Sequence, residues 1–129
     1  MNKDQTTEQA IVAAGANVAP RITPADIEAN IVSAHYFTAR EGCEGAGGVG
    51  GTYPVGLGLL TFCVLVLRNG FTVTGESACA SPENFNADIG RRVARDNAVA
   101  KVWPLMGYEL KERLAHGMFI EGTLEQTAE

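Results

Sequence analysis

The chain has few of the residues that usually build a metal or thiol centre. It contains only two histidines and three cysteines, and no two cysteines show the C-x-x-C spacing. Cys43, Cys63 and Cys79 are therefore expected to be free thiols, with Cys63 and Cys79 serving as small buried hydrophobic residues. His35 and His116 have no ligand-like spacing to them. We predict neither a metal site nor a bound cofactor.

The sequence also lacks an excess of positive charge and a long hydrophobic run. Its 10 basic and 15 acidic residues give a net charge of −5, which argues against broad nucleic-acid binding but leaves room for a local basic patch. The longest apolar run, 57–67, is about half the length that a membrane helix needs. The first residues show no secretory signal pattern. We expect a soluble, intracellular protein.

Composition divides the chain into one domain and two tails. Residues 1–21 are polar and rich in alanine and are expected to form a mobile tail, and residues 118–129 are expected to form an acidic tail. The span 22–117 suits a single small domain. Within it, the stretch 41–58 holds eight of the 15 glycines and is predicted to be a loop.

The glycine-rich loop contains the pattern G-x-G-x-x-G over residues 45–50. A dinucleotide fingerprint requires a strand directly before this pattern and a helix directly after it. The preceding letters, TAREGCE, do not read as a strand, and Pro54 disfavours a helix starting after the loop. The pattern therefore favours a connector or a flap over a phosphate site.

A helix is predicted at the start of the domain, in TPADIEANIVSAHYF. Thr23 is placed to cap it, Pro24 suits the first helical position, and Asp26 is favoured by the helix dipole. Three apolar residues share one face at helical spacing: Ile27, Ile31 and Ala34. The helix is expected to end at residues 35–37.

The segment LLTFCVLVLRNGFTVTGES predicts a β-hairpin. Two strand-like runs are joined by Asn69-Gly70, the pair that prefers a two-residue type I′ turn. This turn would pair Val66 with Val73 and Val64 with Gly75. The predicted class is α+β: an N-terminal helix and a two-stranded antiparallel hairpin, alone or within a larger or intersubunit sheet, packed on C-terminal helices.

The two faces of the predicted hairpin differ in polarity. The first is apolar and suited to packing on helices; it consists of Phe62, Val64, Val66, Phe71 and Val73. The second combines apolar and polar side chains: Cys63, Leu65, Leu67, Thr72, Thr74 and Glu76. The second face is more apolar than a solvated sheet should be, so we expect another helix or a second subunit to cover it. A homo-oligomer is the resulting prediction.

Helical segments follow the hairpin. Ser81-Pro82 and Asn86 are cap signals, and a helix is predicted from residue 87 to Pro104, where it must kink or end. Its apolar face is predicted to consist of Ile89, Val93, Ala100 and Trp103. Asp96 lies in the middle of this face. Because a buried carboxylate requires a partner, we assign Asp96 and Arg92 a structural polar role.

Basic side chains gather on the other side of this helix: Arg91, Arg95 and Lys101. Like charges at i and i+4, such as Arg91 and Arg95, are mildly unfavourable without an anion nearby. The pattern indicates either a solvated basic face or a site for a phosphate group or an acidic partner, assisted by Ser81 and Asn84. The sequence shows no nucleophile–base pair and no paired carboxylates, so no catalytic residue is assigned.

The block NGFTVTGESACASPENF, with IVSAHYFTA upstream, resembles a family of small tailed-phage and prophage proteins. That family is named after gene product forty-nine of one phage and gene sixty-six of another, and the resemblance covers residues 22–115. The label is positional and brings no assigned catalytic or ligand residues. The resemblance implies an accessory protein in the cytoplasm of an infected bacterium.

Three functions stay open on this basis. The leading hypothesis is non-enzymatic binding and neutralisation of a host or anti-phage defence component, which would be a host-takeover or anti-defence role. The alternatives are a sponge for a phosphate-bearing nucleotide signal at Arg91 and Arg95, and a small enzyme that uses Asp96 or Cys79. We expect no membrane partner.

Overall fold

The computed structural model describes residues 2–47 and 52–124, and the chain forms two compact units. One unit spans Asn30–Val102 and contains the sheet together with the first part of the long helix α5 (Ala87–Leu124). The other unit contains α1 (Lys3–Ala13), most of α2 (Pro24–Asn30) and the remainder of α5. The single domain over 22–117 stays a prediction.

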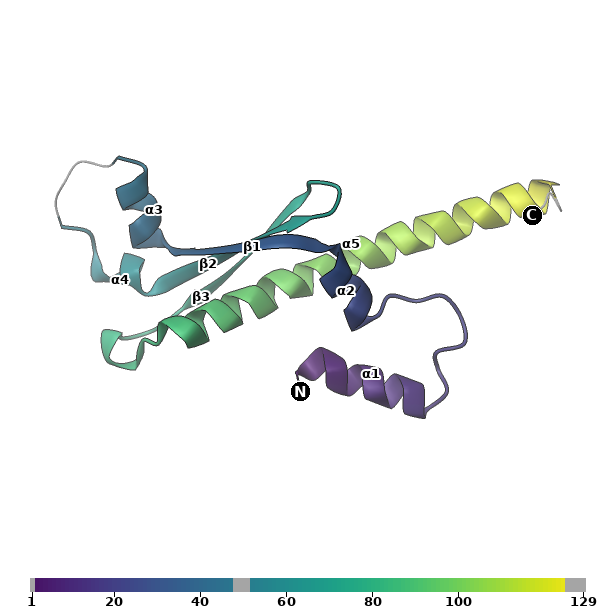
Figure 1. Ribbon diagram of the computed structural model, residues 1–129, viewed down its shortest axis with the longest axis horizontal. Coiled ribbons are helices and arrows are strands. Elements are labelled where there is room, and N and C mark those ends of the chain that lie inside the picture. Colours follow the sequence, from purple (N-terminus) through teal and green to yellow (C-terminus); the bar gives the residue numbers. More distant parts are fainter. Residues whose placement is uncertain (1, 48–51, 125–129) are drawn as a thin grey trace. The chain divides into compact units, whose positions relative to one another are not determined.

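The sheet has three antiparallel strands, so the α+β class is confirmed and the strand number is corrected. Its order is β1 (Ile31–Thr38), β2 (Leu60–Leu67) and β3 (Thr72–Ala78), with β2 in the centre (Figure 1). Strand β1 lies where the N-terminal helix was predicted to continue. The sequence IVSAHYFT is rich in β-branched and aromatic residues, which pack well on a pleated surface. Pairing with β2 outweighs its coincidental helical spacing.

The start of the predicted helix is confirmed, although the helix is short. The Thr23 hydroxyl accepts a hydrogen bond from the Asp26 amide at 3.1 Å, and the Asp26 carboxylate accepts one from the Thr23 amide at 2.9 Å. This reciprocal pair resembles a capping box, which satisfies two backbone donors at the helix start. Helix α2 therefore begins at Pro24 as predicted and ends at Asn30, directly before β1.

The hairpin between β2 and β3 is confirmed, but its turn and register differ from the prediction. The Leu67 amide donates to the Phe71 carbonyl at 2.8 Å, so three residues form the loop instead of two. Gly70 has φ +90°, and the Asn69 side chain accepts from the Phe71 amide at 2.9 Å. A three-residue loop ending in a left-handed glycine shifts β3 by one position. Leu65 consequently pairs with Val73.

The shifted register changes which side chains share a face. Partners across an antiparallel ladder lie on the same side of a sheet, so Val73 and Gly75 join the side of Leu65 and Cys63. These four residues are buried, and helix α5 packs against this side (Figure 1). The face predicted to be half-polar is therefore the covered one. The other face of β2, with its half-buried Val64, lies away from α5.

Small residues bring α5 very close to the sheet. Its buried row recurs every four residues: Gly90, Ala94, Ala98 and Val102. A Cβ atom on Gly75 of β3 would lie 2.3 Å from the Ala94 carbonyl oxygen and 2.3 Å from the Ala98 nitrogen. The predicted apolar face of this helix was therefore wrong, because Ile89 is 54% exposed. The close approach of backbones selects small side chains over large apolar ones.

Helices lie within two spans that were expected to be a loop and a mobile tail. The glycine-rich span 41–58 contains most of α3 (Ala39–Gly45), which Thr38 caps, and all of α4 (Val55–Gly58). The predicted N-terminal tail contains α1, capped by Asn2. Its Glu8 side chain accepts two hydrogen bonds from Arg21, at 2.7 and 2.5 Å, which hold the pKa of Glu8 below its usual value.

The long helix passes through its proline. Helix α5 continues beyond Pro104 to Leu124, into the predicted acidic tail, and residues 125–129 lie outside the described part of the chain. Trp103 donates a hydrogen bond from its ring nitrogen to the Asp4 carboxylate of α1 at 3.0 Å. Within the described residues, no helix combines the length and the apolar character that a membrane crossing requires.

Candidate functional site

The structure places one predicted basic residue, Arg95, in a defined polar cluster. Arg95 is half-buried on the flank of α5, beside the row of small residues that faces the sheet. It lies close to the Tyr36 hydroxyl of β1 and to the Cys63 thiol of β2. Tyr36 and Cys63 are partners across the β1–β2 ladder, so both side chains are on the α5 side of the sheet. Together these three residues form the Arg95 cluster.

Burial controls the chemistry of this cluster. Desolvation raises the pKa of Tyr36 above its usual value, while the positive charge of Arg95 acts in the opposite direction. Desolvation likewise raises the pKa of Cys63, against the opposing effects of the Tyr36 hydroxyl and Arg95. The Cys63 thiol is completely buried, so it is a protonated packing residue, as its sequence context predicted. Arg95 is half-buried and Tyr36 is 36% exposed, so the cluster reaches the surface through these two residues.

Arg91 lies one turn before Arg95 on the same side of α5. It forms an ion pair with the Asp88 carboxylate, and its side chain is 45% exposed against 86% for Asp88. An exposed pair of this kind contributes little to stability and can exchange its partner at little cost. The anionic neighbour that the two adjacent arginines required is therefore present within the helix itself.

The remaining predicted basic residue is displaced from this pair. Lys101 is exposed and lies about 120° around the helix axis from Arg95, at 100° per residue. On the other flank of the helix, the Asn97 side-chain amide donates to the Glu76 carbonyl of β3 at 2.8 Å. The structure thus brings Arg91 and Arg95 together without Lys101.

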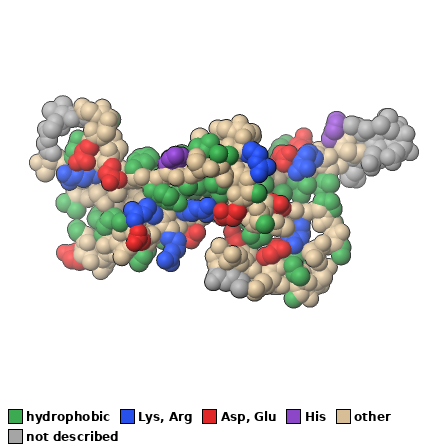
Figure 2. All heavy atoms as spheres, in the orientation of Figure 1, with side chains coloured by type: hydrophobic (Ala, Val, Ile, Leu, Met, Phe, Trp, Pro, Cys, Tyr) green, Lys and Arg blue, Asp and Glu red, His purple; other side chains and the backbone are tan. Residues whose placement is uncertain are grey.

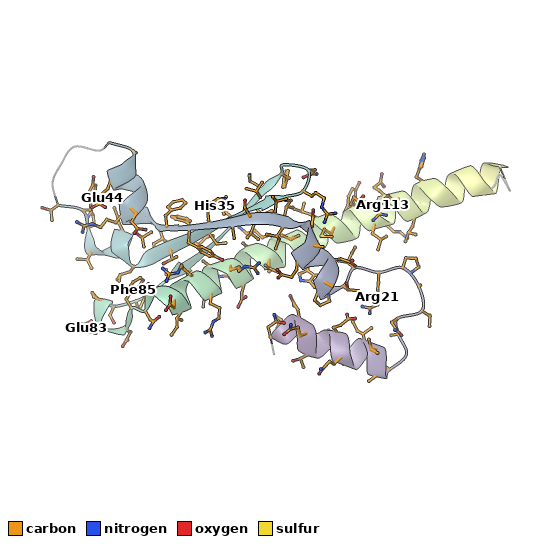
Figure 3. The ribbon with its side chains drawn as sticks, in the orientation of Figure 1. Arg21, His35, Glu44, Glu83, Phe85 and Arg113 are labelled. Carbon is orange, nitrogen blue, oxygen red and sulfur yellow. The ribbon has the colours of Figure 1, made fainter. Side chains whose placement is uncertain are left out.

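The polar corner before α5 is a short 3₁₀ turn, η1 (Pro82–Asn84). The Asn84 amide donates to the Ser81 carbonyl at 3.2 Å, and the Cys79 thiol donates to the same oxygen at 3.2 Å. The corner also carries Glu83, whose carboxylate is exposed (Figure 3). Ser81 and Asn84 are predicted anion contacts, and this arrangement occupies the Asn84 amide within the turn.

Two residues that were predicted to be structural are on the surface. Asp96 and Arg92 are both exposed, whereas Asp96 was expected to be buried on the apolar face. Asp96 is exposed because α5 is rotated about its axis relative to the prediction. Ala94 and Ala98 face the sheet in place of Val93 and Ala100. Asp96 therefore needs no buried partner.

The glycine pattern lies only partly within the described residues. Gly45 ends α3 and Gly47 has φ +77°, while residues 48–51 lie outside the described part. A strand, β1, does precede the pattern, but helix α3 separates the two. This order of elements differs from the strand–loop–helix unit of a dinucleotide site. Among the described residues, no group of three or more His, Cys, Asp or Glu side chains has the arrangement of a metal site.

Tyr36 is the cluster member that sequence reasoning missed. The residue was assigned to the end of a helix, where its neighbours gave no reason to connect it with Arg95. Period-two alternation in the strand would have placed Ala34, Tyr36 and Thr38 on one face of the sheet. That alternation was the available signal.

Comparison with known proteins agrees with the resemblance seen in the residues. The phage protein family described as N4 Gp49/phage Sf6 gene 66 matches residues 22–114, which include the whole sheet and the Arg95 cluster. Neither the curated proteins nor the solved structures yield a match. The chain belongs to the phage protein family named for N4 Gp49 and phage Sf6 gene 66.

Proposed function

We propose that this phage protein acts in the cytoplasm of the infected host by binding a host or anti-phage defence component, without catalysing a reaction. The observation that carries the proposal is the Arg95 cluster. It offers a guanidinium and a phenolic hydroxyl at a partly exposed position. Both groups donate hydrogen bonds, and both suit an anionic group on the partner.

The Arg95 cluster is a locally positive site on a chain whose net charge is negative, which supports binding of an anionic group. The chain has a net charge of −5, whereas Arg91 and Arg95 lie one turn apart on the same side of α5. A basic site on an acidic protein favours anionic partners at that site and repels them elsewhere. The ion pair with Asp88 keeps Arg91 available, because an incoming anion has only an exposed carboxylate to displace.

The residues weighed for catalysis fit a binding role better. Asp96 is exposed on α5, and the Cys79 thiol donates to a backbone carbonyl. A nucleophilic thiol must be ionised and accessible. Cys63 is fully buried with a raised pKa, so it does not meet that requirement.

The experiment is affinity capture from phage-infected cells with two matched variants. We expect the wild-type protein to retain a partner that Arg95→Gln loses, while Arg92→Gln on the exposed face keeps it. Both variants remove one charge from the same helix, so the difference isolates the cluster. Capture that is the same for wild type, Arg95→Gln and Arg92→Gln would overturn the proposal. Tyr36→Phe should weaken capture less, because it removes one neutral donor.

A second candidate function is a sponge for a phosphate-bearing nucleotide signal. The observation that favours it is the proximity of Arg91 and Arg95 at i and i+4, because two guanidinium groups suit the oxygens of one phosphate. Thermal shift with linear and cyclic nucleotides tests it. We expect stabilisation of the wild-type protein that Arg95→Gln reduces, and the absence of any stabilisation would retire the candidate.

A further inference from the structure

Strand β1 forms one edge of the three-stranded sheet. Within the described residues it pairs with β2 alone, so its outer side has no strand beside it. The middle of β1 is exposed on both faces of the sheet, because His35, Tyr36 and Phe37 alternate between the faces and all three are exposed. An edge strand presents N–H and C=O groups that can bond to another extended segment.

Backbone hydrogen bonds at the end of β2 indicate which groups of β1 point outward. On the β3 side, the Leu67 amide donates to the Phe71 carbonyl at 2.8 Å. On the β1 side, the Arg68 amide donates to the Asn30 carbonyl at 2.9 Å. Because the backbone groups of a central strand point to its two neighbours in turn, odd-numbered residues of β2 bond to β3 and even-numbered residues bond to β1. The β1 partners of those even-numbered residues are Ser33, His35 and Phe37.

The outward backbone groups of β1 therefore belong to Ala34 and Tyr36, which lie between the bonded residues. We name the outward side of these two residues the β1 edge. One end of it is closed, since the Thr38 amide donates to the Glu41 carboxylate at 2.8 Å in the cap of α3. A β-bulge at the start of the strand ends it on the other side. The β1 edge thus offers two amides and two carbonyls to a short extended segment.

The opposite edge of the sheet is protected. Glu76 of β3 pairs with the even-numbered Phe62, so its backbone groups point away from β2. The Asn97 side-chain amide of α5 donates to the Glu76 carbonyl at 2.8 Å, and the Glu76 side chain adds an exposed charge. Charged and covering side chains are common protections of a sheet edge. The stretch SAHYF of β1 contains no proline, lysine or carboxylate, so it lacks these devices.

The Arg95 cluster lies directly beside the β1 edge. Tyr36 belongs to both, because its backbone points outward while its hydroxyl lies close to the Arg95 guanidinium on the α5 side of the sheet. Arg91 precedes Arg95 by one turn on the same side of α5. Figure 2 shows basic side chains gathered over the first part of α5. An extended segment at the β1 edge would consequently lie next to positive charge.

The pleat of an added strand fixes which of its side chains meets that charge. The side chain opposite Tyr36 would lie on the same side of the sheet as Tyr36, next to Arg95. The residues before and after it would face the other side, level with His35 and Phe37. On that side the rings of Phe37 and Phe62 are in contact, with centroids 5.6 Å apart. The arrangement therefore suits one acidic residue between apolar residues.

We propose that the β1 edge binds an extended segment of the partner protein, with an acidic side chain opposite Tyr36 and apolar side chains on either side of it. The inference rests on the proposed function and names the kind of partner segment that the Arg95 cluster receives. In strand addition, main-chain hydrogen bonds give affinity, and alternate side chains give specificity.

Charge argues against β1 of a second copy as the added strand. The sequence of β1, IVSAHYFT, contains no carboxylate to meet Arg95. Antiparallel pairing of two β1 strands would also bring the Arg95 residues of the two copies toward each other, and like charges disfavour such an interface. An acidic segment of a different protein neutralises Arg95 instead.

The test is selection from a library of random peptides of about ten residues displayed on yeast, with the full chain as the bait. We expect the wild type to enrich peptides in which an acidic residue stands between apolar ones. Ala34→Pro removes an outward amide and leaves the bonds to β2, so it should weaken a selected peptide at least about tenfold. Ala34→Ser is the matched control, because it keeps that amide and should bind within about twofold of wild type.

Two further variants test the charge. Arg95→Gln should weaken the selected peptide about tenfold and abolish the preference for an acidic residue, whereas Arg92→Gln should stay within about twofold of wild type. Circular dichroism and thermal melting confirm that each variant is folded. An acidic preference that survives Arg95→Gln overturns the placement of the acidic residue beside Arg95.

Hydrogen exchange on the wild type tests the β1 edge without any substitution. In the free chain the amides of Ala34 and Tyr36 should exchange faster than those of His35 and Phe37, which bond to β2. A saturating selected peptide should slow the two outward amides at least about tenfold. A bound peptide that leaves their exchange unchanged overturns strand addition, even where Ala34→Pro fails to fold.

The outcomes separate this inference from the proposed function. A selection that enriches no peptide, or a selected peptide that Ala34→Pro binds as well as the wild type does, overturns the β1 edge and leaves the capture experiment with Arg95→Gln to decide the proposed function. Sedimentation of the wild type provides the remaining check. A dimer that Ala34→Pro dissociates would place a second copy at the β1 edge and would likewise overturn the inference.

Discussion

The two faces of the sheet differ in how closely they are packed. Under α5, the contact between helix and strand is made by Gly75 against Ala94 and Ala98, so that backbones almost touch. On the side of the sheet away from α5, Phe62, Val64 and Val66 of β2 stay half-buried. The comparison shows that the closest packing in this molecule uses its smallest residues. Larger apolar residues lie on both sides of β2: Leu65 is completely buried beneath α5, whereas Phe62, Val64 and Val66 stay half-buried on the side that α5 does not cover.

The strongest way to break the covered face is to add a side chain at Gly75. Gly75→Val places a Cβ 2.3 Å from backbone atoms of α5, and neither the strand nor the helix can yield locally. We expect a loss of more than about 4 kcal/mol of unfolding free energy, or no folded protein. Gly107→Ala is the matched control, because open space surrounds Gly107 within the same helix, and it should stabilise the chain by about 1 kcal/mol. Urea unfolding measures both.

Truncating one side chain on each face compares the two directly. Leu65 is completely buried beneath α5, and Leu65→Ala should cost about 3 kcal/mol through lost burial and a cavity. Val64, the preceding residue, lies on the side of the sheet away from α5, and Val64→Ala should cost less than about 1 kcal/mol. Equal losses at the two positions would mean that the faces are covered alike.

The sequence predicted the elements better than it predicted their faces. The start of α2 at Pro24 and the hairpin around Asn69-Gly70 followed from local capping and turn chemistry, which act over a few residues. The faces depended on a single extra residue in the turn and on the rotation of α5. Neither is encoded locally, because Asn-Gly suits loops of two or three residues and apolar spacing does not report how close two backbones come.

In the candidate site, too, one part follows from local sequence and another part depends on how distant segments pair. Arg91 and Arg95 could be found from helical spacing alone, since i and i+4 share one side of any helix. Tyr36 could not be found from the helix predicted over 24–37, because its position beside Arg95 depends on β1 pairing with β2. That pairing joins segments about 30 residues apart in the chain.

Removing one buried hydroxyl is expected to stabilise the protein, whereas Gly75→Val and Leu65→Ala destabilise it. Thr61 is 3% exposed under the first turn of α5, and within the described structure its Oγ1 has no hydrogen-bond partner. A buried polar group without a partner costs free energy, and valine has the same shape without the hydroxyl. Thr61→Val should therefore stabilise the protein by about 1 kcal/mol in urea unfolding. A loss of stability instead would show that the hydroxyl is satisfied in solution.

The smallest expected effect is the change of the unfolding free energy at alkaline pH. Burial raises the pKa of Cys63 above its usual value of about 8.5. A raised pKa means that the folded state binds the proton more tightly than the unfolded state. The stabilisation is therefore complete at neutral pH and is lost as the pH rises through the thiol range.

Comparing Cys63→Ala with the wild type isolates this dependence. The variant is less stable at every pH because a buried sulfur is lost, but its unfolding free energy should fall less steeply from pH 8 to pH 10. Cys43 is exposed, so Cys43→Ala should keep the wild-type slope. Identical slopes for Cys63→Ala and the wild type would mean that the covered face does not keep the thiol protonated.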